Sequence, residues 1–203
     1  MTNNSNPGED KAWEMLLGMK PGDVCRATGA SHDPATGCYT LRSFNMDFAV
    51  STNDRTIFSS VPGSSVLLTR LAYFFKLSIL WYLVSAKDIP CTGRLLKLQS
   101  VRNGDIFTRG SHTLPLESVA NKYGKDKEGF IEKGKQLGGE IMVLGDASIK
   151  LFPFPGVPVI LTLWLEDDEF PSRVDLLLDS TCDLQVPTDI IWSIAMMSVL
   201  ILL

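Results

Sequence analysis

The sequence predicts a single α+β domain, and three features of the chain carry this prediction. Residues 23–60 and 140–179 hold short β-prone runs separated by turn-forming residues. The stretches 65–86 and 190–203 are strongly apolar and have the length of helices. No internal repeat and no Pro/Ser-rich linker divides the 203 residues, a length that suits one domain.

The first 60 residues predict a short helix followed by β-hairpins. Residues 1–8 are rich in Asn, Ser and Pro and are expected to form a flexible tail, so that the folded domain spans 9–203. Asp10 is suited to begin a helix that ends before Pro21-Gly22. From Asp23 to Ser60 the alternation predicts three or four short strands.

The first apolar stretch predicts one long buried helix from Ser64 or Ser65 to about Ala86. Arg70 and Lys76 interrupt it, and its uncharged part is well short of the roughly 20 residues that cross a bilayer. Large aromatic side chains lie on more than one helical face, so we expect the helix to be enclosed on several sides. These residues are Tyr73, Phe74, Phe75, Trp81 and Tyr82. They are typical of a core, with a pocket for a flat cofactor as the alternative.

The middle of the chain predicts a hairpin and two short helices. The run 94–101 reads as a strand, Asn103-Gly104 as a tight turn and 106–108 as the return strand. Helices are expected at 116–123 and 126–137, with Gly138-Gly139 capping the second.

The last third predicts a four-stranded antiparallel meander covered by the last helix. The expected strands are Glu140 to Leu144, Ala147 to Phe152, Val157 to Glu166 and Arg173 to Asp179, joined by short turns. Val157 to Trp164 is apolar on both faces and should be central. The helix after Pro187 is apolar all round and must be buried. We expect Trp192, Met196 and Val199 to face the sheet.

Composition and charge indicate which partners the protein can bind and in which cell compartment it is expected. The net charge of −4 and pI near 5.2 argue against nucleic acid. Residues 1–120 hold 12 basic and 10 acidic side chains, and residues 121–203 hold 7 and 13. If the protein has an ion-binding face, the later part of the chain is therefore expected to supply it. The polar N-terminus lacks the apolar core of a signal peptide, which predicts a cytoplasmic protein. An association with membranes is not expected. The oligomeric state stays open.

The four cysteines, Cys25, Cys38, Cys91 and Cys182, lie far apart and form no CxxC motif. This spacing fits neither a zinc ribbon nor a ferredoxin-type cluster, so reduced thiols are expected. A Cys25–Cys38 bridge across a hairpin is the alternative. Cys91 lies near Lys87 and Arg94, which would lower its thiol pKa if they were close; the other reading is an inert thiol.

Several short motifs along the chain are distinctive. They are Gly110-Ser111-His112 with Leu114-Pro115, Leu137-Gly138-Gly139, Gly145-Asp146-Ala147, the run PGVPVILTLWLEDDEFP from Pro155 to Pro171, Leu177-Leu178-Asp179 and, weakly, Thr28-Gly29-Ala30. Through these motifs the chain resembles an uncharacterised domain family of anaerobic bacteria and archaea. Some members are joined to a four-cysteine iron–sulfur domain of the corrinoid iron–sulfur protein type, which this chain lacks. The resemblance implies anaerobic redox or corrinoid-linked metabolism and an iron–sulfur or corrinoid protein as partner.

The acidic run Glu166 to Glu169, between Trp164 and Phe170, is the first candidate for chemistry. Carboxylates at a strand end are suited to Mg²⁺ or Ca²⁺, and one crowded carboxyl is suited to act as a general base. The alternative is a solvated loop that prevents edge pairing. If alternation continues past Trp164, Glu166 and Asp168 lie on its side of the strand.

Two histidines extend this hypothesis. His112 lies in a predicted loop between a strand and a helix, where functional residues are common, and His32 lies in a turn-rich segment. A metal would take Asp168, Glu169 and His112, and Asp146 with Glu169 and a histidine is a second arrangement. The candidate site as a whole is His112, Asp146, Trp164, Asp168, Glu169 and Asp179. Gly138-Gly139 and Gly145-Asp146 match no phosphate-loop fingerprint and read as turn and cap glycines.

Three classes of function follow. The first is a ligand-binding or accessory protein linked to anaerobic redox or corrinoid metabolism. The second is a metal-dependent enzyme centred on the acidic run with His112, its cofactor a divalent cation. The third is an interaction protein that docks through its C-terminal apolar helix.

Overall fold

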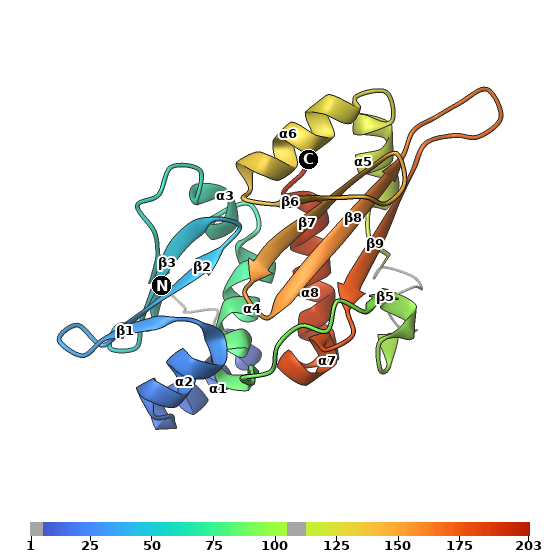
Figure 1. Cartoon of the computed structure of the whole chain (residues 1–203). Helices are drawn as coiled ribbons and strands as arrows, with labels where there is room; N and C mark the ends of the chain where they lie inside the picture. The colour runs from blue at the N-terminus through green and yellow to red at the C-terminus, as the bar shows by residue number, and fades with distance from the viewer. Residues whose placement is uncertain (1–5, 105–112) are drawn as a thin grey trace.

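The computed structural model describes residues 6–104 and 113–203, and it confirms the α+β fold. Two antiparallel sheets lie side by side, one with the strand order β1-β2-β3-β4 and one with the order β5-β9-β8-β7-β6. Helices α4 and α8 lie behind the second sheet in the view of Figure 1. The predicted return strand 106–108 and His112 lie outside the described residues.

The N-terminal region is more helical than its sequence pattern predicts. Helix α1 (Pro7–Gly18) begins before Asp10, because the side chain of Asn6 accepts a hydrogen bond from the Gly8 N–H. Residues 7 and 8, which the sequence analysis places in the tail, therefore belong to this helix. Helix α2 (Pro21–Thr28) replaces the strand expected from Asp23. A proline is well suited to the first helical position, and Gly29, with φ +73°, caps the end.

The first sheet confirms the predicted hairpins. Its strands are β1 (Ser31–Asp33), β2 (Cys38–Ser43), β3 (Met46–Ser51) and β4 (Thr56–Phe58). The β2–β3 turn is made of Phe44 and Asn45, both at positive φ, as a two-residue hairpin requires. Phe44 is buried, and its N–H donates to the carbonyl of Phe152 in the second sheet (2.9 Å). This turn therefore joins the two sheets.

The predicted long apolar helix is divided in two. Helix α3 (Ser65–Leu68) and helix α4 (Ala72–Ser85) are separated at Thr69, where the backbone leaves the helical region. The Thr69 hydroxyl donates to the Ser65 carbonyl (2.7 Å), a contact that bends helices by competing with the backbone ladder.

Helix α4 is enclosed on several sides, as predicted. It packs against α1 and α8 and contacts α2 and α3. Phe75 meets Phe48 of the first sheet at a ring distance of 4.5 Å, and Tyr82 stacks on Phe154 of the second at 4.8 Å. Tyr73, by contrast, is 67% exposed. The aromatic residues thus build core contacts rather than one cofactor pocket.

The middle segment keeps one predicted strand in shortened form. It contains β5 (Leu95–Lys97), a 3-10 turn (Leu98–Ser100), α5 (Leu116–Tyr123) and α6 (Lys127–Gln136). Both predicted short helices are confirmed. Gly138, at φ +72°, follows α6, and the Gly139 N–H donates to the Gly134 carbonyl, so this pair caps the helix as expected.

The second sheet confirms the meander and adds β5 to its edge. Its remaining strands are β6 (Glu140–Met142), β7 (Ala147–Phe154), β8 (Val157–Trp164) and β9 (Arg173–Asp179). β8 is central, and its residues are buried up to Leu163. The strand at the other edge, β6, is only three residues long. Ile141 within it and Val143 just after it are exposed apolar residues. A short edge limits unwanted pairing with other chains.

The last helix, α8 (Thr188–Leu200), follows the short α7 (Cys182–Gln185) and is a core element. It packs most extensively against α4, and it also contacts β7. Trp192 faces α4 rather than the sheet, because its ring lies against Phe74 at 5.7 Å; this part of the prediction is wrong. Since α8 is buried within its own chain, it offers no docking surface. Among the described residues, no helix is long and apolar enough to cross a membrane.

Candidate functional site

Trp164 and Asp146 come together at the end of the second sheet where β8 meets β9. They line a cavity of about 480 Å³ together with Leu165, Asp167, Phe170, Pro171, Ser172 and Arg173. Of the predicted candidates outside this cavity, Asp168 and Glu169 lie at the exposed tip of the β8–β9 loop. Figure 1 shows this loop extending from the body of the molecule at the upper right.

The indole of Trp164 is held in place from several directions. Its Nε1–H donates to the carboxylate of Asp175 on β9 (3.2 Å). The guanidinium of Arg173 lies 4.7 Å from the ring centroid, in the position of a cation–π contact. Gly145 packs so closely that a Cβ there would lie 3.3 Å from the indole. The ring is therefore fixed before any ligand arrives.

One end of the acidic loop is anchored to the turn after α5, and the other end to α5 itself. Glu166 pairs with Lys125 (2.8 Å), and the Ser172 hydroxyl donates to the Ala120 carbonyl (3.2 Å). Asp146, across the cavity, accepts a hydrogen bond from the Leu165 N–H (2.9 Å). These contacts hold both ends of the loop, and residues at these ends line the cavity.

The four acidic side chains of the loop have separate roles. Glu166 is paired with Lys125, and the Asp167 carboxylate accepts the N–H groups of Glu169 and Phe170 to form the turn. Asp168 and Glu169 are exposed. Strand alternation does not extend past Trp164, because β8 ends there. Within residues 6–104 and 113–203, no three His, Cys, Asp or Glu side chains gather in a metal-binding arrangement.

We expect Mg²⁺, Mn²⁺ and Ca²⁺ at millimolar concentration to leave the melting temperature unchanged. The physical reason is that the turn and the Lys125 pair already use two of the four carboxylates, whereas a hard cation needs several oxygen ligands at once. A thermal-shift series with each ion is the measurement. An ion-dependent increase that Asp168→Asn or Glu169→Gln abolishes would contradict this expectation and establish the predicted metal site.

Asp179, the last candidate, lies at the other end of β9. It is six residues from Arg173, roughly 20 Å along a strand, so it does not join the Trp164 cavity. Its carboxylate accepts the N–H groups of Thr92, Gly93 and Thr181 and is also bonded to the Thr92 and Thr181 hydroxyls, at 2.7–3.2 Å. Burial raises its pKa, but these hydrogen bonds outweigh burial and lower the pKa below its ordinary value.

Cys91 lines a cavity of about 330 Å³ beside Asp179. Burial raises the pKa of its thiol, and the charge of Asp179 raises it further, whereas Lys150 opposes the shift. Lys87 and Arg94 are not among the groups that shift this pKa, and the net upward shift agrees with the alternative of an inert thiol. All four cysteines are free in the structure. His32, the described histidine, lies against Tyr39 at a ring distance of 4.6 Å.

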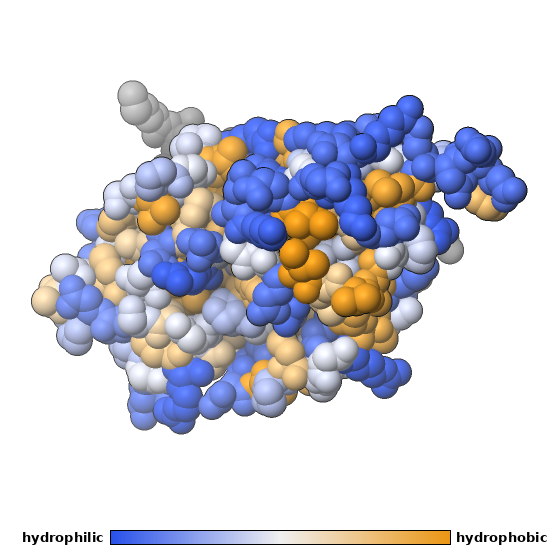
Figure 2. All heavy atoms as spheres, turned by 45° about the horizontal axis from the view of Figure 1, so that its top comes forward, coloured by the Kyte–Doolittle hydropathy of each residue, from blue (hydrophilic) through white to orange (hydrophobic). Residues whose placement is uncertain are grey.

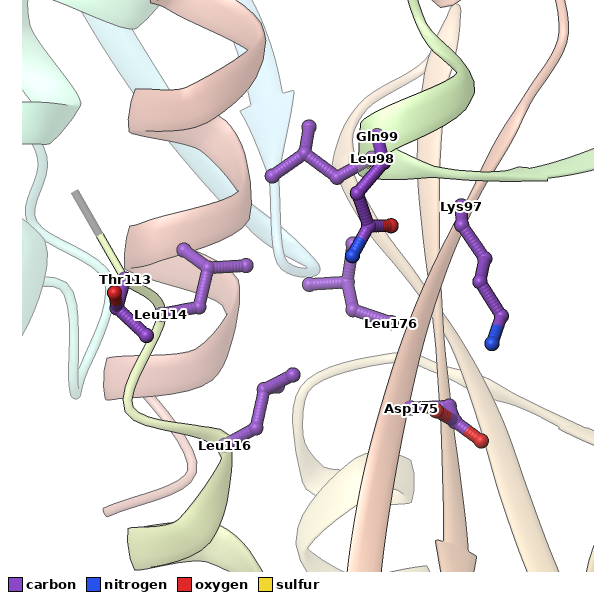
Figure 3. Close-up of a pocket in the computed structure, with 8 residues that line it drawn as sticks. All are labelled: Lys97, Leu98, Gln99, Thr113, Leu114, Leu116, Asp175 and Leu176. Carbon is purple, nitrogen blue, oxygen red and sulfur yellow. The ribbon is translucent and has the colours of Figure 1, made fainter. Parts of the chain in front are cut away.

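A smaller cavity of about 210 Å³ lies at the β5–β9 edge. Figure 3 shows Leu98, Leu114, Leu116 and Leu176 directed toward one another, while Lys97 and Asp175 lie on the other side of β9. The charged groups thus face away from the leucines, so we interpret this cavity as a gap in the apolar packing.

Sequence reasoning missed Arg173, which lines the Trp164 cavity, and Asp175, which accepts the hydrogen bond of the Trp164 indole from outside the cavity lining. Arg173 pairs with Trp164 in the β8–β9 register, and Asp175 pairs with Thr162, two residues further along β9. The predicted hairpin already placed β9 beside β8, so counting the register back from the loop would have found both. Figure 2 shows that the side of the molecule around this loop is mainly hydrophilic, with apolar side chains in smaller groups.

Comparisons with known proteins identify a family but no characterised relative. No curated protein and no solved structure shows significant similarity to the chain. The family described as a domain of unknown function (DUF3786) matches residues 20–200, which is nearly the whole chain, and the chain therefore belongs to this family.

Proposed function

We propose that this domain is a ligand-binding accessory protein and that the Trp164 cavity is its binding site. The observation that carries the proposal is the fixed indole of Trp164, which bears the Arg173 guanidinium and lines one cavity with Asp146 and Asp167. At about 480 Å³ the cavity has the size that holds a small organic molecule.

The chemistry of the lining favours a small zwitterion. One guanidinium suits a carboxylate or phosphate group, and two carboxylates suit an ammonium group. Each of these carboxylates has one oxygen held by backbone N–H groups, Asp146 by Leu165 and Asp167 by the loop, which leaves its other oxygen to a ligand. Phe170 and Pro171 supply an apolar wall. Fixed groups of this kind reduce the ordering that binding would otherwise require.

The metabolic setting is proposed from the family resemblance alone. In anaerobic redox or corrinoid-linked metabolism, this chain would act beside an iron–sulfur or corrinoid protein that carries the cofactor. A cavity of this size supports the assignment of the small ligand to this chain and of the larger cofactor to the partner.

Calorimetric titration with free amino acids and dipeptides tests the binding site. We expect saturable binding by at least one zwitterion, and at least tenfold weaker binding by its N-acetyl form, which lacks the cation, and by its amide form, which lacks the anion. Arg173→Gln and Asp146→Asn should each weaken binding by at least tenfold, because each leaves one charge of the ligand without its partner.

The matched control is Arg26→Gln, which removes an exposed arginine on α2 that forms an ion pair with Asp23. It should bind like the wild type. Equal loss of binding in Arg26→Gln and Arg173→Gln, or equal affinity for the zwitterion and its amide, would reject the Trp164 cavity as the site.

A further inference from the structure

A second cavity, separate from the Trp164 cavity, lies at the C-terminal end of α8, beside the β2–β3 turn of the first sheet. Its volume is about 560 Å³. It is lined by the β2–β3 turn, the segment around α3, the end of α6 and the residues after α8. The lining residues are Phe44, Asn45, Met46, Val61, Pro62, Gly63, Val66, Arg70, Lys133, Gln136, Leu137, Ile201 and Leu203. The set contains two cations and two amides but no carboxylate side chain.

Two cations in this region, Arg70 and Lys122, bind carbonyl groups at the C-terminal end of α8. Arg70 donates to the Leu200 carbonyl (2.8 Å), and Lys122 donates to the carbonyls of Leu202 (2.8 Å) and Leu203 (3.2 Å). Cations are favourable there, because the last carbonyls of a helix are unpaired and the helix dipole is negative at this end. Lys122, which does not line the cavity, therefore has a structural role, whereas Arg70 uses only Nη2 for the Leu200 carbonyl and also lines the cavity.

The ammonium group of Lys133, by contrast, does not bind the carbonyl groups at the end of α8. It is half-buried on α6, and no ion pair or hydrogen bond joins its ammonium group to another residue of the described chain. Burial lowers its pKa, and the positive charges of Lys122 and Arg70 lower it further. A cation is thus held beside two others, against their repulsion, and no acidic side chain among the residues that line the cavity offsets it.

From this geometry we propose that the cavity binds a small amphipathic anion, a carboxylate or phosphate group on an apolar body. Arg70 has a planar fork of donors that matches such a group, Lys133 adds a point charge, and Asn45 and Gln136 add amide donors. Met46, Val61, Val66, Leu137 and Ile201 form the apolar walls. The volume suits a ligand of this size.

The test uses octanoate and octyl phosphate as probes, titrated calorimetrically into the full chain. One or both should bind saturably with one site per chain and should bind more weakly as ionic strength increases. Octanamide, which has the same body without the charge, and inorganic phosphate, which has the charge without the body, should each bind at least tenfold more weakly. Octanoate and octyl phosphate together distinguish a carboxylate site from a phosphate site.

Lys133→Gln should weaken probe binding by at least tenfold, and Lys135→Gln should not. Lys135 lies on the same helix but does not line the cavity, so it is a matched control. The melting temperature of unliganded Lys133→Gln should equal or exceed that of the wild type, because the substitution removes a repelled charge. Unchanged binding in this variant, equal binding of octanamide, or a lower melting temperature that marks Lys133 as structural would each overturn the proposal.

Discussion

A chain that ends at Pro187 should not fold. The truncation removes α8, whose side chains include the fully buried Ile191, Ile194 and Met197. The loss of each large buried side chain costs roughly 2–5 kcal/mol, so the total exceeds the stability of about 5–15 kcal/mol typical of a domain. Circular dichroism and urea unfolding should therefore show a molten or insoluble product. A truncated chain that unfolds cooperatively would show that α8 is not core.

Ile194→Ala gives the same test in a chain that still folds. It should lower the free energy of unfolding by about 2–5 kcal/mol, because it opens a cavity between α4 and the second sheet. Leu17→Ala removes a similar volume from an exposed position of α1 and should have little effect. If the two variants lose similar stability, the assignment of α8 to the core is rejected.

Asp179→Asn should lower the free energy of unfolding by about 3 kcal/mol at neutral pH. The buried carboxylate accepts N–H groups from the 92–93 segment and from Thr181, and an amide nitrogen would face these donors with donors of its own. Urea unfolding of the variant and the wild type measures the difference. Asp183→Asn, an exposed neighbour, is the control and should be neutral.

The same carboxylate gives an acid dependence of known sign. Its pKa in the folded chain lies below the ordinary value of 3.8, so its stabilising contribution is complete above that value and is lost as the pH falls through the folded pKa. Between about pH 5 and pH 2, the wild type should therefore lose more stability than Asp179→Asn does. Parallel stability curves over this range would show that Asp179 makes no charge-dependent contribution.

The fold was predictable where local chemistry decides it. The meander follows from turn residues such as Gly145-Asp146, and the capping role of Gly138 follows from its position after an amphipathic run. The failure at α2 has the same origin, because Pro21 either ends one helix or begins the next, and the sequence pattern does not distinguish the two. Local signals thus identified most elements, but they missed α2, the division of the long apolar helix at Thr69 and the exact start of α1.

The sites were less predictable because long-range contacts assemble them. Trp164 and Asp146 were found since they flank predicted turns of one meander. The cavity at the end of α8 was missed because its cations come from separate elements, and Arg70 meets a carbonyl 130 positions away. Asp179 was chosen because it lies in a distinctive run. In the structure, however, its carboxylate binds backbone groups such as the Gly93 N–H and stabilises the fold.

The pairing of β5 with β9 also bears on the order in which the chain folds. Among the strands that the structure describes, every other pair joins neighbours in sequence, whereas Gly93 meets Asp179 across 86 positions. Closing a loop of that length loses about 4 kcal/mol of chain entropy, which short hairpins largely avoid. Because long-range contacts must overcome this entropy before they stabilise the chain, we expect them to form after the hairpins. β5 should then be the last strand to join the sheet, where the N–H groups of Thr92 and Gly93 bind the Asp179 carboxylate and hold the strand in place.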